Sequence, residues 1–296
     1  TMKTLLRHTP LICVLLLPAA SAIAELVNFE IIKTESPYFD GRSFGDVGQY
    51  EMITARATIA VDPGHRLNAG IVDIDLASTN SDGRVEATAD VAILRPVDLS
   101  KGSGRLFYEV LNRGDKISFI LMNDAPWVRY YHGLDAGNGH LMNEGYTVVW
   151  SGWQGDLIDR GTNVVAHLPF ALENGKHLRG WVRQEFNPMS ENILSVGVSA
   201  GAERGPDVQP YPVLDRVTAT LTMRQNEADP RVAVPDSEWE LASVEVVDGK
   251  VVLTPSDIDL YIKGGFKPGW IYEFIYETEG SRVMNLGFLG IRDLMS

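Results

Sequence analysis

The sequence predicts an α/β fold built on a partly parallel sheet. Residues 106–111 and 146–150 are two short apolar runs rich in β-forming residues, and the first stops at the turn Asn112-Arg113-Gly114. Residues 140–144 look like the last turn of a helix, with Gly145 just past its end. Two runs that are apolar on both faces, separated by a helix-bearing stretch, are typical of neighbouring parallel strands joined by a crossover.

These two runs also carry a resemblance to a known family. Residues 107–114 read Phe-Tyr-Glu-Val-Leu-Asn-Arg-Gly, and residues 145–156 read Gly-Tyr-Thr-Val-Val-Trp-Ser-Gly-Trp-Gln-Gly-Asp. Both stretches resemble the third and fourth strands of α/β-hydrolases, and are most similar to a group of large, exported α/β-hydrolase-domain proteins. The likeness extends from about residue 44 to the last residue. It implies a partial α/β-hydrolase sheet with an antiparallel β-rich N-terminal region and a β-rich insertion.

The first 24 residues have the pattern of a secretory signal peptide. Lys3 and Arg7 precede the short apolar core 11–17, and small residues follow at 20–24. The apolar core is too short to span a bilayer, and a buried N-terminal helix is the alternative. We therefore expect export to the periplasm or the extracellular space, with no membrane attachment after the signal is removed.

Residues 25–156 are expected to hold the β-rich start and the first strands of the α/β domain. Residues 50–61, 71–76 and 84–94 alternate or are enriched in β-branched side chains, and Asp82-Gly83 fits a tight turn. This region is predicted to be either the antiparallel start of the main sheet or a small β-module that leans on it.

Residues 157–263 are predicted to form a cap-like β insertion. The alternating runs in this segment are 181–186, 217–223 and 238–247, and Asp248-Gly249 marks a hairpin. Residues 264–296 then return to the α/β pattern, with a strand at 270–276 and an amphipathic helix at 283–295. The resemblance implies that the chain stops before the nucleophile elbow, so that the nucleophile, acid and histidine lie beyond Ser296.

The turn Asn112-Arg113-Gly114 is the candidate catalytic element. The loop after the third strand of α/β-hydrolases supplies one backbone N–H to the oxyanion hole, so the resemblance assigns that role to Asn112, Arg113 and Gly114. A glycine would let the main chain approach the substrate oxygen closely. The alternative is a simple turn whose Arg113 pairs with a carboxylate.

A second motif, Gly197-Val198-Ser199-Ala200-Gly201, matches Gly-x-Ser-x-Gly literally. A nucleophile elbow requires a helix directly after the serine, and Gly205 and Pro206 prevent one. The acid and histidine should also follow the serine, yet the last histidine is His177. We interpret Ser199 as a chance match, which leaves no credible nucleophile.

Charge and cysteine content exclude several function classes. The formal net charge of −13 argues against binding of a nucleic-acid backbone. The only cysteine, Cys13, lies in the predicted signal, so no disulfide, thiol nucleophile or cysteine metal site is expected. Asp73 and Asp75 lack further ligands at calcium-loop spacing, and no metal or other cofactor is expected.

Two function classes remain open from the sequence. The first is the N-terminal portion of an exported serine esterase-like hydrolase, acting on a small ester-like substrate and inactive without its missing half. The second is an exported β-rich binding module without catalysis. Substrate and oligomeric state are not predicted.

Overall fold

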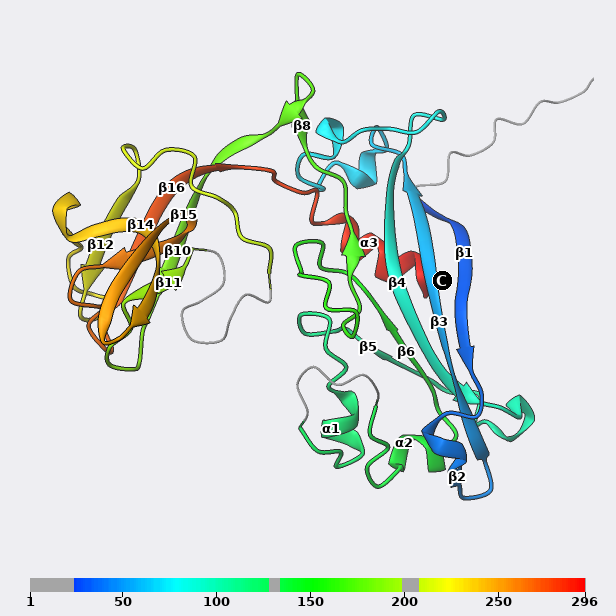
Figure 1. Cartoon of the computed structure of the whole chain (residues 1–296). Coiled ribbons are helices and arrows are strands. Elements are labelled where there is room, and N and C mark those ends of the chain that lie inside the picture. The colour runs from blue at the N-terminus through cyan, green and yellow to red at the C-terminus, as the bar shows by residue number, and fades with distance from the viewer. Residues whose placement is uncertain (1–23, 128–133, 199–207, 296) are drawn as a thin grey trace, which may run out of the picture.

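A computed structural model describes residues 24–127, 134–198 and 208–295, so nearly all of the predicted signal peptide lies outside the described chain. The described residues form two β-rich bodies that are plainly separate in Figure 1. The first body, called the long-sheet body here, is one large sheet. The second, called the sandwich, consists of two smaller sheets that share a core. The chain enters the sandwich after β7 of the long sheet and returns to the long-sheet body at its C-terminal helix.

The long sheet has seven strands in the order β1-β3-β4-β6-β5, with β2 paired to β3 and β7 paired to β4. Their bounds are β1 (Ala24–Glu35), β2 (Ser43–Phe44), β3 (Gly48–Val61), β4 (Val85–Pro96), β5 (Leu106–Glu109), β6 (Thr147–Ser151) and β7 (Ala166–His167). The predicted parallel pairing is confirmed, since β5 runs parallel to β6 from Leu106↔Thr147 to Glu109↔Trp150. Every other pair in the sheet is antiparallel.

Helices in the described part of the chain are few and short. The α-helices are α1 (Ser118–Met122), α2 (His140–Asn143) and α3 (Leu286–Leu294). The 3₁₀ turns are η1 (Phe39–Gly41), η2 (Arg66–Asn68), η3 (Ile74–Leu76), η4 (Leu99–Lys101) and η5 (Asp236–Glu238). The predicted C-terminal amphipathic helix is confirmed as α3, which packs on β1, β3 and β4.

The two faces of the long sheet are covered differently. On β3, Ala57 and Ile59 belong to buried clusters that include side chains of α3. Met52 and Arg56, two positions of the opposite parity, point to the other face. On that second face, Phe119 of α1 and Leu141 and Met142 of α2 belong to the buried cluster that contains Tyr50 and Trp150. Figure 1 shows both helices beside one end of the long sheet.

The sandwich comprises a four-stranded sheet, β10-β16-β12-β13, and a three-stranded sheet, β11-β15-β14. Both are antiparallel, with bounds β10 (Arg179–Phe186), β11 (Ser195–Gly197), β12 (Thr220–Arg224), β13 (Val232–Ala233), β14 (Trp239–Val247), β15 (Lys250–Ile262) and β16 (Ile271–Glu279). Aromatic residues Trp239, Tyr272 and Phe274 fill the shared core. The hairpin β8 (Leu172–Glu173) and β9 (Lys176–His177) lies on the connection between the bodies.

The predicted α/β fold, a partial α/β-hydrolase sheet, is wrong. The described chain is predominantly β, with sixteen strands and three α-helices, and its sheets are mostly antiparallel. An α/β arrangement needs helices that cover both faces of a parallel sheet. The helices described in the crossover from β5 to β6 are α1 and α2, of five and four residues, which are too short to form such a layer. The local motif was interpreted correctly as a parallel pair, but it does not extend to the rest of the sheet.

Two further segments differ from expectation or extend it. The strand predicted at 71–76 is wrong, because Ile71 and Ile74 are buried three residues apart and the chain forms the 3₁₀ turn η3 there. Residues 179–279 form the β-rich sandwich, whose pairing reaches past residue 263, the expected end of the insertion. Strand β16 pairs with β10 and β12 of the sandwich, so the chain rejoins the long-sheet body only after Glu279.

Candidate functional site

A pocket of about 460 Å³ lies against the face of the long sheet that carries α1. Its floor is formed by side chains of β3 and β4, among them Arg56 and Asp90. One wall is the loop that follows β5, residues 115–117, and another is the loop 159–164. The loop that follows β5 therefore lines this cavity at residues 115–117.

Glu109, the last residue of β5, organises the wall that carries α1. Its side chain is buried, and its Oε1 accepts a hydrogen bond of 2.8 Å from the Ile117 N–H. Its Oε2 accepts hydrogen bonds from the Ser118 N–H at 3.1 Å and from Trp150 Nε1 at 2.6 Å. Three N–H donors thus satisfy this carboxylate, and none of them is a cation.

Lys116 lines the pocket beside Trp150, the residue whose indole bonds Glu109. Its Nζ is 5.8 Å from the centre of the Trp150 ring, and the residue is partly buried. Burial lowers the pKa of Lys116 to about 8, against the opposing influence of Glu109, Asp115 and Asp90. Among the described residues, no carboxylate lies within ion-pair distance of this ammonium. Lys116 is therefore a cation that faces the pocket without a direct partner in the described chain.

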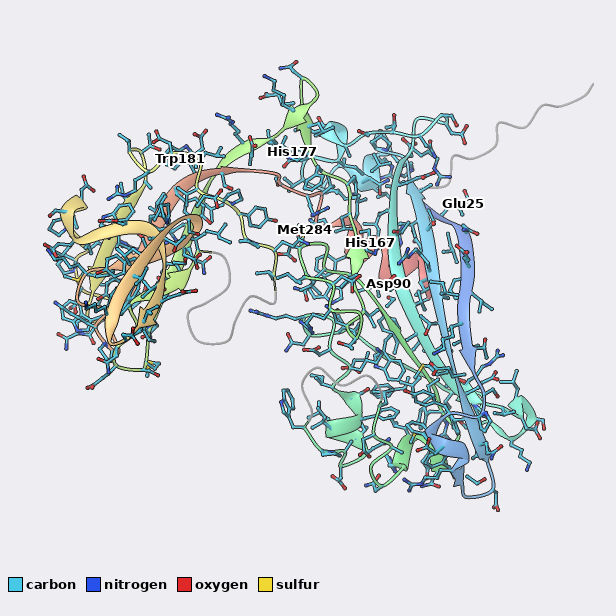
Figure 2. The ribbon with its side chains drawn as sticks, in the orientation of Figure 1. Glu25, Asp90, His167, His177, Trp181 and Met284 are labelled. Atoms are coloured by element: carbon cyan, nitrogen blue, oxygen red, sulfur yellow. The ribbon has the colours of Figure 1, made fainter. Side chains whose placement is uncertain are left out.

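The other two cations that line the pocket are paired. Arg56 Nη2 lies 2.8 Å from Asp90 Oδ1, and this bond raises the pKa of Arg56. Lys33 Nζ lies 3.0 Å from Glu35 Oε1. Asp90 and His167 are labelled in Figure 2, and His167 Nε2 is 3.9 Å from Asp90 Oδ1. These pairs lie on β1, β3, β4 and β7, along the sheet side of the cavity.

The carboxylate next to Lys116 is engaged elsewhere. Asp115 Oδ1 accepts a hydrogen bond of 2.5 Å from Arg160 Nη2 in the opposite loop. Asn163 holds the same loop, because its Oδ1 accepts the Arg160 N–H at 2.8 Å and its Nδ2 donates to the Ile158 carbonyl. Asp115, the residue before Lys116 in the chain, thus joins the two loops through its carboxylate.

Apolar and aromatic side chains close the remaining wall. Ile117, Ile120 and Leu134 line the pocket together with Trp127, whose side chain is 67% exposed. The Tyr38 hydroxyl accepts a hydrogen bond from the Leu134 N–H, and burial raises the pKa of Tyr38. The arrangement suits a small molecule with an apolar body and one oxygen acceptor directed at Lys116.

The predicted oxyanion turn lies next to this pocket and is internally bonded. The Arg113 N–H donates to Gln154 Oε1 at 2.9 Å, and the Asp115 N–H donates to the Asn112 carbonyl. Gly114 has φ +79°, and a Cβ placed on it would lie 2.8 Å from the Val164 carbonyl oxygen. The group that lies close to Gly114 is therefore the backbone of Val164.

The other predicted positions lie apart from the pocket or outside the described chain. Ser199 is outside the described residues. Trp153, which belongs to the segment 145–156 that carries the resemblance, donates its Nε1–H to the Leu111 carbonyl and stacks on Phe288 of α3 at 5.1 Å. His177 stacks on Phe170 at 4.5 Å, on the connection to the sandwich (Figure 2).

Sequence reasoning missed Lys116 and Glu109 as site residues. A usable signal was present for Glu109, because it is the only charge in the apolar run 106–111, and a charge buried in a strand requires partners. No comparable signal marks Lys116, whose lack of a direct partner depends on hydrogen bonds made by Glu109 and Asp115 to distant segments.

Comparison of the chain with protein-family models, with curated proteins and with solved structures found no match. Across the described ranges, no group of three or more histidine, cysteine, aspartate or glutamate side chains is arranged to hold a metal ion. No helix of the described chain has the length and apolar character needed to cross a bilayer.

Proposed function

We propose that this protein is an exported binding module whose long-sheet pocket holds a small organic molecule. The ligand class is a compound with an aromatic or branched aliphatic body and one acceptor oxygen, a carboxylate or an ester-like carbonyl. One observation carries the proposal: the Lys116 ammonium faces the pocket without an ion pair in the described chain, while Lys33 and Arg56 of the same pocket are paired.

Recognition of the ligand is assigned to two sets of side chains. Lys116 donates to the acceptor oxygen, and charge-assisted hydrogen bonds of this kind are about twice as strong as neutral ones. Ile117, Ile120 and Trp127 contact the apolar body. The pocket volume of about 460 Å³ lies within the range of small-molecule sites.

The ester-like part of the ligand class agrees with the resemblance of residues 107–114 and 145–156 to hydrolase-domain proteins. That resemblance stays a prediction, as do export and membership of the family. Binding through Lys116 does not require the predicted oxyanion turn, because Arg113 donates its amide to Gln154.

The test is isothermal titration calorimetry with benzoate and with phenyl acetate. Lys116→Met should weaken the binding of benzoate at least about tenfold, the usual scale for loss of one charged hydrogen bond. Lys116→Arg should retain most of the affinity, because the cation and its donors remain. Lys33→Met is the matched control and should bind as the parent protein does, since Lys33 is already paired with Glu35.

Equal affinity of the parent protein and Lys116→Met for both probes would contradict the proposal. Hydrolysis of phenyl acetate that depends on a residue of this chain would replace it with the esterase alternative.

A further inference from the structure

We infer that the Lys116 side chain captures small aldehydes in the long-sheet pocket by forming an imine. This inference rests on the proposed function, because the same pocket must admit the ligand, and it names a carbonyl class that the pocket holds covalently. Geometry supplies the starting point: Lys116 lines the cavity, and no hydrogen bond or ion pair within the described chain occupies its nitrogen.

The surroundings of Lys116 raise the share of its neutral amine form. Glu109, Asp115 and Asp90 are the carboxylates that oppose the loss of its proton, and each has another direct partner: three N–H donors, Arg160 and Arg56 respectively. These carboxylates therefore act on the ammonium only through space. Burial outweighs them and lowers the pKa of Lys116 to about 8, from the usual 10.5.

The consequence at neutral pH is a much larger supply of nucleophile. With a pKa near 8, roughly one Lys116 side chain in ten is an uncharged amine at pH 7, against fewer than about one in a thousand for a solvated lysine. Desolvation of a lysine in an apolar site is an established route to an amine nucleophile. The pocket supplies such walls at Ile117, Ile120 and Trp127.

The reaction is balanced without an oxidant, a reductant or a metal. The lone pair of Nζ forms a bond to the aldehyde carbon, and the carbonyl π electrons move to the oxygen. A proton passes from nitrogen to that oxygen to give a carbinolamine. The carbon–oxygen bond then breaks, water leaves with the second nitrogen proton, and the carbon–nitrogen double bond of the imine remains.

The experiment uses the purified protein, benzaldehyde as the probe and sodium borohydride as the trap. Reduction of the imine gives a stable secondary amine, and the labelled peptide gains the mass of benzaldehyde less one oxygen atom. Peptide mapping should place at least about ten times more label on Lys116 than on Lys33 at pH 7, because Lys33 is exposed and paired with Glu35. Labelling of Lys116 should rise about tenfold per pH unit below pH 7, more slowly as the pH passes through 8, and should level off near pH 9.

The variants separate this inference from the proposed function. Lys116→Arg removes the primary amine and must abolish the trapped adduct at this position. If benzoate binds and benzaldehyde is trapped on lysines without preference for Lys116, the imine is refuted and the proposed function stands. If benzoate does not bind and the adduct still forms on Lys116, the proposed function is refuted and the amine chemistry stands.

Discussion

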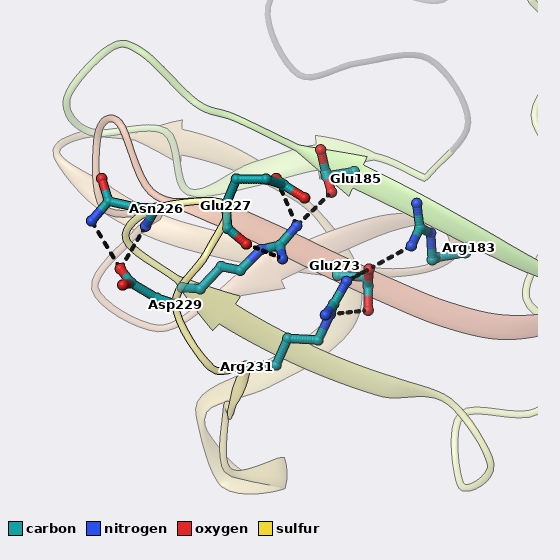
Figure 3. Close-up of polar contacts among 8 residues, drawn as sticks. Arg183, Glu185, Asn226, Glu227, Asp229, Arg231 and Glu273 are labelled. Atoms are coloured by element: carbon teal, nitrogen blue, oxygen red, sulfur yellow. Dashed lines mark hydrogen bonds and ion pairs between the residues drawn. The ribbon is translucent and has the colours of Figure 1, made fainter.

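The two bodies of this protein each bury a glutamate, and they neutralise it in opposite ways. In the long-sheet body, Glu109 accepts hydrogen bonds from two backbone amides and an indole, none of which is charged. In the sandwich, Glu273 is paired with two arginines. Arg231 bonds both of its carboxylate oxygens at 2.8 and 3.0 Å, and Arg183 lies 3.2 Å away (Figure 3).

This difference determines which lysine and arginine side chains in the described chain remain without an ion-pair partner. On the sandwich face, Arg224 is also paired, with Glu227 at 2.8 Å and Glu185 at 3.3 Å, so acids and bases are matched there (Figure 3). In the long-sheet body, Glu109 is satisfied by neutral donors, and the nearby Lys116 of the pocket is left without a direct partner in the described chain. The buried glutamate of the sandwich thus pairs with arginines, whereas the buried glutamate of the long-sheet body leaves the nearby Lys116 without an ion pair in the described chain.

The largest effect is expected from removal of Glu109. Glu109→Ala leaves the Ile117 and Ser118 amides and the Trp150 indole without their acceptor, which should cost the long-sheet body about 3–5 kcal/mol. Native-state hydrogen exchange should show lost protection in β5, β6 and α1, and unchanged protection in the sandwich. Glu109→Gln keeps one acceptor oxygen and should lose less. Equal loss of protection in both bodies would contradict the separation drawn between them.

The second effect tests how the long-sheet body is closed by a helix that follows the sandwich in the chain. A Cβ on Gly287 of α3 would lie 1.8 Å from the Trp153 carbonyl oxygen, so Gly287→Ala should displace α3 and cost about 2–3 kcal/mol. Gly290 of the same helix is the matched control, because its Cβ would meet only Ile59 Cδ1 at 3.7 Å. Gly290→Ala should therefore raise stability by about 0.5–1 kcal/mol through helix propensity alone.

Chemical unfolding of the two glycine variants, followed by the fluorescence of the tryptophans, measures this contrast. Similar stabilities of Gly287→Ala and Gly290→Ala would show that α3 does not depend on close contact with the Trp153 backbone.

The third effect concerns Lys116 and has the opposite sign. Because the folded pKa is about 8 and the ordinary value is 10.5, the folded state disfavours the charge of Lys116. Lys116→Met should then stabilise the protein at pH 7 by about 1–3 kcal/mol, at about 1.4 kcal/mol per pKa unit. The gain should be complete below pH 8 and should vanish as the pH rises to about 10.5. Thermal unfolding of the parent and variant at pH 7, 9 and 10.5 checks this, and a gain that does not change with pH would contradict it.

The sequence was sufficient for local elements and insufficient for their assembly. The runs at 106–111 and 146–150 predicted the parallel pair β5–β6, because both are apolar on both faces and are separated by a crossover. The alternation in 181–186 and 238–247 likewise predicted β10 and β14. The fold class failed because a parallel pair does not by itself specify helical layers, and the helices of this crossover have only four and five residues.

The candidate site could not be predicted from the sequence, for a related reason. Local sequence predicted a turn at 112–114 and directed attention to its amides, one of which Gln154 engages from forty-one residues away. Lys116 becomes distinctive only when Glu109 bonds α1 and Trp150, and when Asp115 bonds Arg160. These contacts join segments up to forty-five residues apart, so no periodicity or spacing in the chain encodes them.

The smallest expected effect concerns Glu273, the buried glutamate of the sandwich. The Arg231 guanidinium, followed by Arg183 and Arg224, lowers the pKa of Glu273 below its ordinary value of 4.5. A lowered folded pKa means that this stabilisation is complete above pH 4.5 and is lost as the pH falls through the folded value. Glu273→Gln should therefore be less stable than the parent at pH 7, and the two should converge in acid.

Thermal unfolding between pH 7 and pH 3 gives the measurement for Glu273→Gln, with the sandwich followed through amide protection in β10, β12 and β16. Thr220→Ser is a suitable control, because Thr220 is an exposed residue of the same sheet and makes no ion pair. The parent and Glu273→Gln should approach each other only below pH 4.5, because Glu273 then takes up a proton and its attraction to the arginines disappears. A constant difference down to pH 3 would mean that Glu273 acts through packing, and the contrast with Glu109 would then lose its electrostatic basis.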